Sequence, residues 1–352
     1  MSGGVDSSVT AYLMKELGFD CVGATMKLFP NGDPSGDARC VADRLAIPHH
    51  ILDFTNEFDT AVIQKFVEAY EAGDTPNPCA ECNRHIKFGK LFSKAVSLGC
   101  DVMATGHYAR IEWDGERACF SLKKALDNTK DQSYFLYSIT QEQLAQVMFP
   151  LGGMKKKDVR DMAAEQGFLN AQKRESQDIC FIPDGNYADF IERYIKNVRD
   201  AKNAKNTKMT QTHGDFIDLE GKPLGKHKGL IRYTIGQRKG LGVAHSHPLY
   251  VCAKNLRNNT VTLGGEEALY STTVEAGSFN WIRFKPAGQI RVMAKTRYRQ
   301  AEQWATVVSA EDDSVRVEFD EPQRAVATGQ ALVLYDGDSV VGGGTIKYTN
   351  RR

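Results

Sequence analysis

Three cysteines in this sequence have surroundings that suit covalent chemistry. Cys79 and Cys82 lie in GDTPNPCAECNRHIKFG (73–89). Two prolines and several turn-forming residues precede them, so we expect a rigid loop to position both thiols. Cys180 lies in RESQDICFIPDGNY (174–187), among polar residues that could expose it. A thiol acts as a nucleophile or a metal ligand in its thiolate form. The sequence therefore indicates sulfur chemistry at these positions.

Basic residues follow the first two thiols closely, and a positive charge lowers the pKa of a nearby thiol. We expect this effect from Arg84, His85 and Lys87. Metal binding is the alternative to catalysis. A zinc site would add His85 and Cys180 to the Cys-x-x-Cys pair, and an iron–sulfur cluster with one open iron would use all three cysteines. A single Cys-x-x-Cys pair is weak support for either metal.

The first residues, MSGGVDSS, form a glycine-rich loop directly before a helical pattern. Glycines let backbone N–H groups turn toward an anion, hydroxyls add donors, and a helix N-terminus adds positive potential. We expect a phosphate cradle over Ser2–Ser8, with Asp6 or Ser7 capping the helix. The loop lacks the Gly-Lys-Ser/Thr of the Walker sequence and the spacing of the dinucleotide fingerprint. It resembles the pyrophosphate loop of enzymes that split ATP between the α and β phosphates and adenylate a carbonyl oxygen.

A loop of this kind normally follows a buried strand. We expect a short apolar strand before Met1, which would then be an internal methionine or the start of a shortened sequence. Without that strand, we expect Ser2–Ser8 to be poorly anchored and ATP binding to be weakened.

Helical and extended patterns alternate over residues 1–187. VTAYLMKELG predicts a helix that stops at Gly18, CVGATMKLF a strand, DARCVADRLAIPH a helix, HILDF a strand, and LFSKAVSLGCDVMATGH a helix, a turn and a strand. Repeated units of this kind predict a Rossmann-like parallel sheet covered by helices, with ligands at the carboxyl ends of the strands.

The second half of the chain has a different pattern. NVRDAKNAKNTKMTQTHGDF (197–216) is rich in Asn, Lys and Thr and predicts a linker or basic loop. Short strand patterns with glycine turns follow, and they predict a small β domain and then a β-barrel or sandwich. We place the α/β domain at 1–187, the central β-rich domain at 188–250 and the C-terminal β-barrel at 251–352.

Composition restricts the class of protein. No apolar run is long enough to span a bilayer and no secretory signal is present, so we expect a cytoplasmic protein without a membrane partner. Eight cysteines in 352 residues are too few for a disulfide scaffold. The net charge is +1, but eleven Lys or Arg against four Asp or Glu occur between Lys196 and Lys239, which suits contact with a phosphate backbone. Five cysteines have apolar neighbours, and we expect these to be core residues: Cys21, Cys40, Cys100, Cys119 and Cys252.

The loop and the thiols together suggest that an oxygen is replaced by sulfur. Adenylation converts a carbonyl oxygen into the leaving group AMP. A persulfide sulfur can then attack the carbon, and a second thiol can resolve the resulting disulfide.

Seven motifs, in this order, resemble those of the tRNA-specific 2-thiouridylases: SGGVDSS, TPNPCAECNRHIKF, ATGHYAR, KDQSYFLY, SQDICFIPDG, TIGQRKGLG and KTRYRQ. The resemblance spans essentially the whole chain. It implies an N-terminal ATP pyrophosphatase domain, a central domain, a C-terminal β-barrel, and ATP-dependent 2-thiolation of the wobble uridine, position 34, of tRNA. It also implies ATP and Mg²⁺ as cofactors and, as partners, tRNA and a persulfide donor such as a cysteine desulfurase or a sulfur relay protein.

The resemblance assigns roles to particular residues. Cys82 is the expected nucleophile and Cys180 the expected persulfide carrier, with a transient disulfide between them. ATP contacts are expected from Ser2, Gly3, Gly4, Val5, Asp6, Ser7, Ser8, Met26 and Gly106. The target base is expected to meet Asn77, Pro78 and Cys79. Contacts with tRNA are expected from Lys130, Asp131, Gln132, Arg297 and Tyr298.

One departure from the family leaves the role of Cys79 open. Many family members have an aspartate at this position, and a carboxylate there could transfer a proton. Cys79 is thus a base-pocket residue, a cluster ligand or a spare thiol.

Two other functions of the protein are alternatives. An adenylating amidotransferase-like or synthetase enzyme that acts on a small carbonyl substrate would not need Cys180, and a zinc-stabilised RNA-binding module would need neither ATP nor a reactive thiol.

Overall fold

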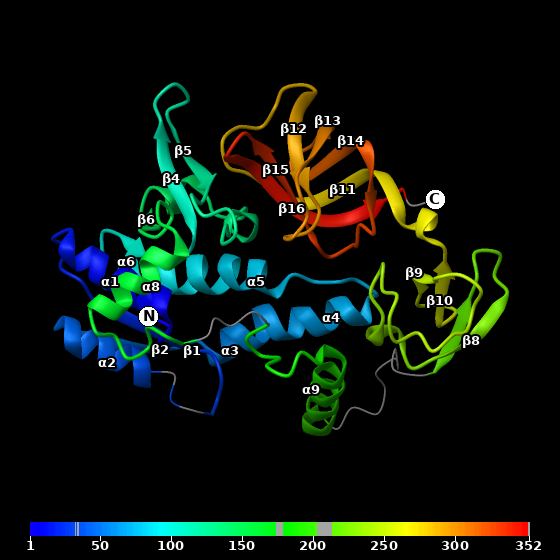
Figure 1. The fold of residues 1–352 in the computed structure, drawn as a ribbon, viewed down its shortest axis with the longest axis horizontal. Helices are drawn as coiled ribbons and strands as arrows, with labels where there is room; N and C mark the ends of the chain where they lie inside the picture. Colours follow the sequence, from blue (N-terminus) through cyan, green and yellow to red (C-terminus); the bar gives the residue numbers. More distant parts are fainter. Residues whose placement is uncertain (32, 34, 174–178, 203–212, 351–352) are drawn as a thin grey trace.

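The structure is a computed structural model, and it describes residues 1–352 except 32, 34, 174–178, 203–212 and 351–352. It has three parts: an α/β part that ends with helix α9 (Tyr187–Lys202), a four-stranded sheet, and a six-stranded barrel. Figure 1 shows the barrel beside the hairpin of β4 (Ala109–Asp114) and β5 (Cys119–Lys124), and the four-stranded sheet at the opposite end of the molecule from α1 (Val5–Glu16). This arrangement confirms the predicted fold class.

Helix α1 follows the glycine loop as predicted, and its buried residues include Val5, Val9 and Met14. It stops before Gly18, whose N–H donates to the Lys15 carbonyl at 2.9 Å. The other predicted elements of this region are also present: β1 (Gly23–Lys27), α2 (Gly36–Leu45), β2 (His49–Asp53), α6 (Phe92–Ser97) and β3 (Met103–Ala104).

Four strands of this part form two separate parallel pairs, while β4 and β5 form an antiparallel hairpin. Strand β1 pairs with β2, and β3 pairs with β6 (Val147–Met148). Met1 lies beside β1, since its amino group donates to the Ala24 carbonyl and its carbonyl accepts from the Thr25 hydroxyl at 2.7 Å. Gly106 comes just after β3, at the carboxyl end of the strand, which is where α/β folds place ligands.

Two long helical segments pack against each other in this part. One consists of α3 (Thr55–Phe58), the π-helix η1 (Asp59–Gln64) and α4 (Lys65–Glu71), and the other of α5 (Pro78–Glu81), the π-helix η2 (Cys82–Leu91) and α6. Val62, Phe66 and Ile86 form part of the core between them. π-Helical turns are rare and often mark functional sites, and η2 begins at Cys82.

Three short helices follow the β4–β5 hairpin: the 3-10 helix η3 (Ser133–Phe135), α7 (Gln141–Leu144) and α8 (Lys156–Glu165). Helix α7 begins with a capping box between Thr140 and Gln143. Val159 and Ala163 of α8 pack with Val5 and Val9 of α1. Helix α8 is therefore positioned beside the glycine loop.

The central sheet has the strand order β8-β7-β10-β9 and a core that includes Phe216, Val251 and Leu263. Its elements are β7 (Gly214–Ile217), β8 (Pro223–His227), the 3-10 helix η4 (Leu230–Arg232), β9 (Tyr250–Asn255), β10 (Thr260–Gly264) and the 3-10 helix η5 (Glu266–Leu269). Because β10 pairs with both β7 and β9, this sheet extends beyond the expected boundary between residues 250 and 251. Part of the basic segment 197–216 lies outside the described residues.

The C-terminal part is a closed antiparallel barrel, as predicted, with the order β11-β14-β13-β12-β15-β16 and β16 paired back to β11. Val292, Val317 and Leu334 are among the residues that fill its interior. Its strands are β11 (Tyr270–Trp281), β12 (Ile290–Lys295), β13 (Gln303–Ala310), β14 (Ser314–Arg324), β15 (Ala331–Asp336) and β16 (Ser339–Thr349).

The prediction that five cysteines are core residues is confirmed for Cys252 only. Cys40 is exposed, and the other three, Cys21, Cys100 and Cys119, are half-buried. The reason is clearest in α2, whose buried face consists of residues 38, 41, 42 and 45, so that Cys40 lies on the other face despite its apolar neighbours in sequence.

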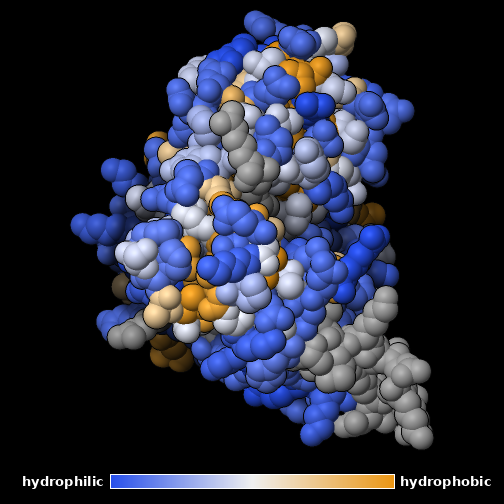
Figure 2. Space-filling model, turned by 90° about the vertical axis from the view of Figure 1, so that its right-hand side faces the viewer, coloured by the Kyte–Doolittle hydropathy of each residue, from blue (hydrophilic) through white to orange (hydrophobic). Residues whose placement is uncertain are grey.

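Hydrophilic residues cover most of the face shown in Figure 2, which looks onto the end of the molecule that carries the central sheet. The apolar residues on this face occur in small groups, which are normal on a protein surface. Within the described residues, every helix is too short or too polar to cross a membrane.

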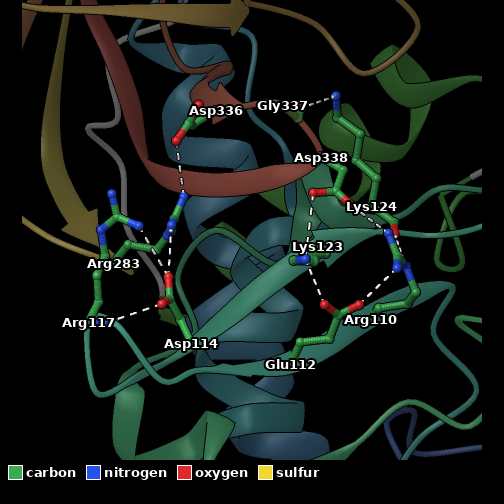
Figure 3. Close-up of polar contacts among 10 residues, drawn as sticks. All are labelled: Arg110, Glu112, Asp114, Arg117, Lys123, Lys124, Arg283, Asp336, Gly337 and Asp338. Carbon is green, nitrogen blue, oxygen red and sulfur yellow. Dashed lines mark hydrogen bonds and ion pairs between the residues drawn. The ribbon is translucent and has the colours of Figure 1, made fainter.

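Charged side chains join the β4–β5 hairpin to the barrel (Figure 3). Arg283 donates to Asp114 of β4 at 2.9 Å and to Asp336 of β15 at 3.2 Å. Arg110 of β4 donates to Asp338 at 2.6 Å. The side chains of Arg283 and Asp114 are only 8% and 17% exposed, so removal of Arg283 leaves the Asp114 carboxylate with the more exposed Arg117, at 3.3 Å, as its remaining cation. We therefore expect Arg283 to stabilise the contact between the hairpin and the barrel.

We expect the substitution Arg283→Met to lower the apparent Tm by roughly 5 °C or more, because Asp114 loses the guanidinium whose hydrogen bond holds its pKa below the ordinary value. The matched control is Lys285→Met, which removes an equally direct ion pair, 2.6 Å long, to a fully exposed Asp312. This control should change Tm by about 1 °C or less. Thermal unfolding followed by circular dichroism measures both, and equal shifts would contradict the role of burial.

Candidate active site

Gly3 and Gly4 shape the loop at the start of α1. Gly3 has a φ of +68°, and a Cβ at this position would approach the Cβ of Asp37 in α2 to 3.1 Å, so the loop requires glycine here. Gly4 is the N-cap and has no side chain to cap the helix. The hydroxyls of Ser7 and Ser8 each donate to the Gly4 carbonyl at 3.0 Å. The prediction that Asp6 or Ser7 caps α1 is therefore wrong. The first N–H groups of a helix have no intrahelical acceptor, which suits them to bind an anion.

Residues from later segments hold the loop in place. The Asn170 amide donates to the Gly3 carbonyl at 3.1 Å and to the Ser8 hydroxyl at 2.9 Å. Gly106 lies against the loop, since a Cβ there would be 2.9 Å from the backbone carbon of Asp6. The loop is thus well anchored, contrary to the expectation for a loop without a preceding strand.

The Asp6 carboxylate accepts two hydrogen bonds that the sequence did not predict. The Tyr108 hydroxyl donates to Oδ1 at 2.9 Å, and the Lys156 ammonium lies 2.6 Å from the same oxygen. Both donors come from segments far from the loop in sequence. Met26, near the end of β1, packs with the core cluster that contains Phe58, and its contact with ATP stays a prediction.

Asn77 and Pro78 begin the helix that carries the first two thiols. The Asn77 side chain accepts from the Ala80 N–H at 3.3 Å and so caps α5, while Pro78 occupies the first helical position, where its missing N–H costs nothing. Cys79 is exposed and Cys82 is half-buried, one helical turn apart. The cap fixes the start of the helix that carries both thiols. The contact of this segment with a base stays a prediction.

A loop of the barrel holds the segment before α5. The Thr75 N–H donates to the Thr328 carbonyl at 2.8 Å, and the Thr328 hydroxyl donates to Asp74 at 2.5 Å. The Gln330 amide donates to the carbonyls of Thr75 and Pro76 at 2.8 and 3.2 Å. No local sequence signal links these segments, so the sequence analysis missed this support for the thiol helix.

The fold brings Cys180 to the other two thiols. Its neighbours Ile179 and Phe181 pack in the same core cluster as Cys82. The pKa of Cys180 also responds to charge on Cys82 and on Cys79, which requires all three thiols to lie close together. Cys180 therefore lies within electrostatic range of Cys79 and Cys82, and the transfer of sulfur between these thiols stays a prediction.

Loss of solvation, not positive charge, dominates the pKa of these thiols, of which Cys79 and Cys180 are exposed and Cys82 is half-buried. Loss of solvation raises the pKa of Cys79 and of Cys82, and the charge of Lys87 only partly opposes this increase. For Cys180, burial together with the two neighbouring thiols raises the pKa to about 11. The expectation of lowered thiol pKa values is wrong, because desolvation penalises the thiolate more than Lys87 stabilises it.

Lys87 is the basic residue that faces the thiols, and His107 holds it there. The Lys87 ammonium lies 3.2 Å from His107 Nε2, and the Thr105 hydroxyl lies 2.7 Å from Nδ1. An ammonium group only donates, so Nε2 accepts and Nδ1 carries the proton. Burial, and then the charge of Lys87, lowers the pKa of His107 well below its ordinary value, so the ring is neutral.

The other two basic residues point elsewhere. The Arg84 guanidinium lies over the ring of Tyr137, 5.6 Å from its centroid. His85 pairs with Glu81 at 3.2 Å instead of joining the thiols in a zinc site. Across the residues that the structure describes, no three His, Cys, Asp or Glu side chains are grouped to hold a metal ion. The zinc and iron–sulfur alternatives therefore have no structural support.

The residues expected to contact tRNA also have internal roles. Asp131 is buried and accepts from the Ala125 and Ser133 N–H groups, and Gln132 accepts from the Tyr108 N–H. Arg297 donates to the Ile235 and Ala325 carbonyls, and the ring of Tyr298 lies 4.4 Å from that of Phe135. Lys130 is half-buried. Contacts between these residues and tRNA stay predictions.

The substitution Lys87→Met should raise the pKa of Cys82 and of Cys180, because it removes the charge that favours their thiolates. Alkylation by iodoacetamide at pH 8 should become about threefold slower or more, since the thiolate is the reacting form. The rate should rise with pH in both proteins, with the midpoint at higher pH in the variant. Mass spectrometry of the two cysteine peptides measures this effect. Lys90→Met, an exposed charge on the same helix, is the control, and equal rates in the two variants would exclude the role of Lys87.

Comparison with known proteins is consistent with this geometry. Three family models match consecutive regions: a tRNA methyl transferase HUP domain over residues 1–184, a tRNA methyl transferase PRC-barrel domain over 204–265, and an aminomethyltransferase beta-barrel domain over 271–346. The last two regions correspond to the central sheet and to most of the barrel.

Curated relatives match over nearly their whole length. The tRNA-specific 2-thiouridylase MnmA of Acetivibrio thermocellus is 45% identical over 362 positions, which cover 99% of this chain and 98% of the relative. The tRNA-specific 2-thiouridylase MnmA 1 of Caldanaerobacter subterraneus subsp. tengcongensis is 46% identical, over 99% of this chain and 96% of the relative. The tRNA-specific 2-thiouridylase MnmA of Clostridioides difficile is 43% identical, over 99% of this chain and 96% of the relative. With this identity over the whole chain and with the three matched regions in order, the protein belongs to the tRNA-specific 2-thiouridylase family.

Proposed function

We propose that this protein is an ATP-dependent sulfurtransferase that converts the wobble uridine, position 34, of tRNA into 2-thiouridine. The names of its relatives support tRNA as the substrate and thiolation as the reaction. The geometry of the loop and of the thiols supports the chemistry by which the sulfur is introduced.

The observation that carries the proposal is the dipeptide Gly106–His107, which joins the two halves of the site. Gly106 lies against Asp6 of the glycine loop. His107 holds Lys87, whose charge acts on all three thiols. The dipeptide thus contacts the loop that suits phosphate on one side and the lysine that acts on the thiols on the other. This supports a reaction in which a nucleotide activates a carbon that sulfur then attacks.

In the proposed reaction, the C2 oxygen of uridine attacks the α-phosphorus of ATP, and pyrophosphate leaves. The terminal sulfur of a persulfide on Cys180 attacks C2, and AMP leaves with the oxygen. The Cys82 thiol then loses its proton and attacks the Cys180 sulfur, which releases 2-thiouridine and leaves a disulfide between the two cysteines. An external dithiol reductant restores both thiols. A cysteine desulfurase or a sulfur relay protein supplies the next persulfide sulfur.

ATP suits the loop as its magnesium complex. The first-turn N–H groups of α1 face the phosphates in this proposal, and Asp6 provides a carboxylate of the kind that Mg²⁺ prefers. Ser2–Ser8, Met26 and Gly106 form the nucleotide site. An iron–sulfur cluster is not part of the proposal, since the three cysteines do not form a metal-binding group in the described structure.

The tRNA is placed over the thiols and the barrel. Asn77, Pro78 and Cys79 face the target base, and the backbone passes Lys130, Asp131, Gln132, Arg297 and Tyr298. The internal bonds of Asp131 and Gln132 keep this segment fixed, so that it can present its backbone and Lys130 to the RNA. We place the reaction in the cytoplasm.

The proposal is tested by incubating the protein with ATP, Mg²⁺, a persulfide donor and unmodified tRNA. Digested tRNA is then analysed for 2-thiouridine by mass spectrometry. We expect product with the wild-type protein and a loss of about 100-fold or more in Cys82→Ala and in Cys180→Ala, because each removes a sulfur that forms a bond in the reaction. The exposed Cys40 lies outside the site, so Cys40→Ala should retain full activity.

Two outcomes would contradict the proposal. Wild-type protein that forms no 2-thiouridine would exclude the reaction. ATP cleavage that depends on a small carbonyl compound, with full activity in Cys180→Ser, would instead indicate an adenylating enzyme that does not need a persulfide carrier.

A further inference from the structure

Lys156 has its ammonium group buried against the glycine loop. Its side chain is 9% exposed, and its Nζ lies 2.6 Å from Asp6 Oδ1 and 5.4 Å from the centroid of the Tyr108 ring. Its backbone N–H donates to Asp127 at 3.0 Å and fixes the start of α8. Helix α8 in turn packs on α1 through Val159. The position of this ammonium relative to the loop is therefore set by the packing of two helices.

The loop itself contains no basic residue, although a nucleotide triphosphate carries several negative charges. In the Walker sequence, a lysine within the loop reaches the β and γ phosphates. SGGVDSS has no such lysine. Among the residues that the structure describes, Lys156 supplies the ion pair to this loop. Lys156 thus supplies, from another segment, the positive charge that the loop sequence does not contain.

Stability alone does not account for this ion pair. The Lys156 side chain is 9% exposed and that of Asp6 is 32% exposed, so burial of the ammonium costs solvation, and an apolar residue of similar size would stabilise this position equally well or better. Tyr108 already satisfies Asp6 with a hydroxyl hydrogen bond. A charged Lys156 must therefore gain its advantage in a state that contains another anion.

We propose that Lys156 binds the phosphate chain of ATP and neutralises the charge that develops on the departing pyrophosphate. This inference rests on the proposed function and identifies a residue that the motifs of the site do not include. Without ATP, Lys156 is paired with Asp6. When ATP arrives with Mg²⁺, the metal takes the carboxylate, which is the ligand it prefers, and the ammonium turns to a phosphate oxygen. No covalent bond to Lys156 forms or breaks.

The experiment compares three variants of the full-length protein. Lys156→Met keeps the length and the apolar stem but removes the charge, and Lys156→Arg keeps the charge. Lys157→Met removes an exposed charge from the next position of the same helix. Three quantities are measured: the Kd for ATP with Mg²⁺ by calorimetry, the rate of tRNA-dependent pyrophosphate release, and the Tm without ATP.

We expect Lys156→Met to raise the Kd for ATP by about tenfold or more, because a charge-assisted hydrogen bond is lost. Pyrophosphate release at saturating ATP should fall by about 100-fold, because the stabilised charge develops in the transition state. Lys156→Arg should retain most of the affinity, and Lys157→Met should match the wild-type protein. Alkylation of Cys82 should be the same in all four proteins, since the thiols are held by a different helix.

A purely structural role predicts a different pattern. Lys156→Met would then have a lower Tm without ATP, while its folded fraction would bind ATP and release pyrophosphate as the wild-type protein does, and this result would overturn the inference alone. Wild-type protein that neither binds ATP nor releases pyrophosphate would overturn the proposed function itself. The two failures are therefore distinguishable.

Discussion

Loss of solvation at the three thiols is the condition on which the rest of the site depends, although the side chains of Cys79 and Cys180 reach the surface. Cys82 and Cys180 lie in or beside the core that joins the two helical segments, and loss of solvation raises the pKa of both. At neutral pH the resting thiols are therefore protonated, which protects them from oxidation and from unspecific alkylation. In a site of this kind, the thiolate form is not populated before the reaction. It suits a reaction in which sulfur is loaded from a donor and deprotonation accompanies each attack.

The barrel positions the thiol helix from two sides. Thr328 and Gln330 hold the segment that leads into α5. On the other side, the ring of Tyr298 lies against Phe135, whose carbonyl accepts a hydrogen bond from Asn83 at 3.0 Å, and Asn83 is the residue after Cys82. A C-terminal domain that lies far along the chain thus reaches the immediate neighbours of Cys82, the proposed nucleophile. The barrel is part of the scaffold of the candidate active site as well as a candidate surface for RNA.

The sequence predicts what depends on local patterns. The glycine loop, α1 with its stop before Gly18 and the first strands follow from spacing and turn residues, and the structure confirms them. For the C-terminal part, the pattern predicts a barrel or a sandwich, the family resemblance implies the barrel, and the structure has the barrel. The sequence cannot give the direction of a side chain. Arg84 and Lys87 are equally close to Cys82 in sequence, but Arg84 turns to Tyr137 while Lys87 acts on the thiols.

Tertiary contacts explain the remaining differences. Asp131 and Gln132 look like solvated loop residues, yet they hold Ala125 and Tyr108 in place. Asp6 and Ser7 look like caps, but they bind other partners. Desolvation raises the pKa of all three thiols, and no local sequence pattern indicates it. For the same reason the sequence does not show that Lys156 meets Asp6.

The two lysines of the site differ in their partners, and this difference separates their effects. Lys156 is paired with the Asp6 carboxylate, so its charge is neutralised until another anion competes for it. Lys87 is held by a neutral imidazole, which orients the ammonium without cancelling its charge. Its field therefore extends to Cys79, Cys82 and Cys180, although burial outweighs it. A carboxylate in place of His107 would hold Lys87 equally well but would remove its stabilisation of a thiolate. The low pKa of the buried histidine thus preserves a positive charge within electrostatic range of the thiols, which the proposed reaction requires to become negative.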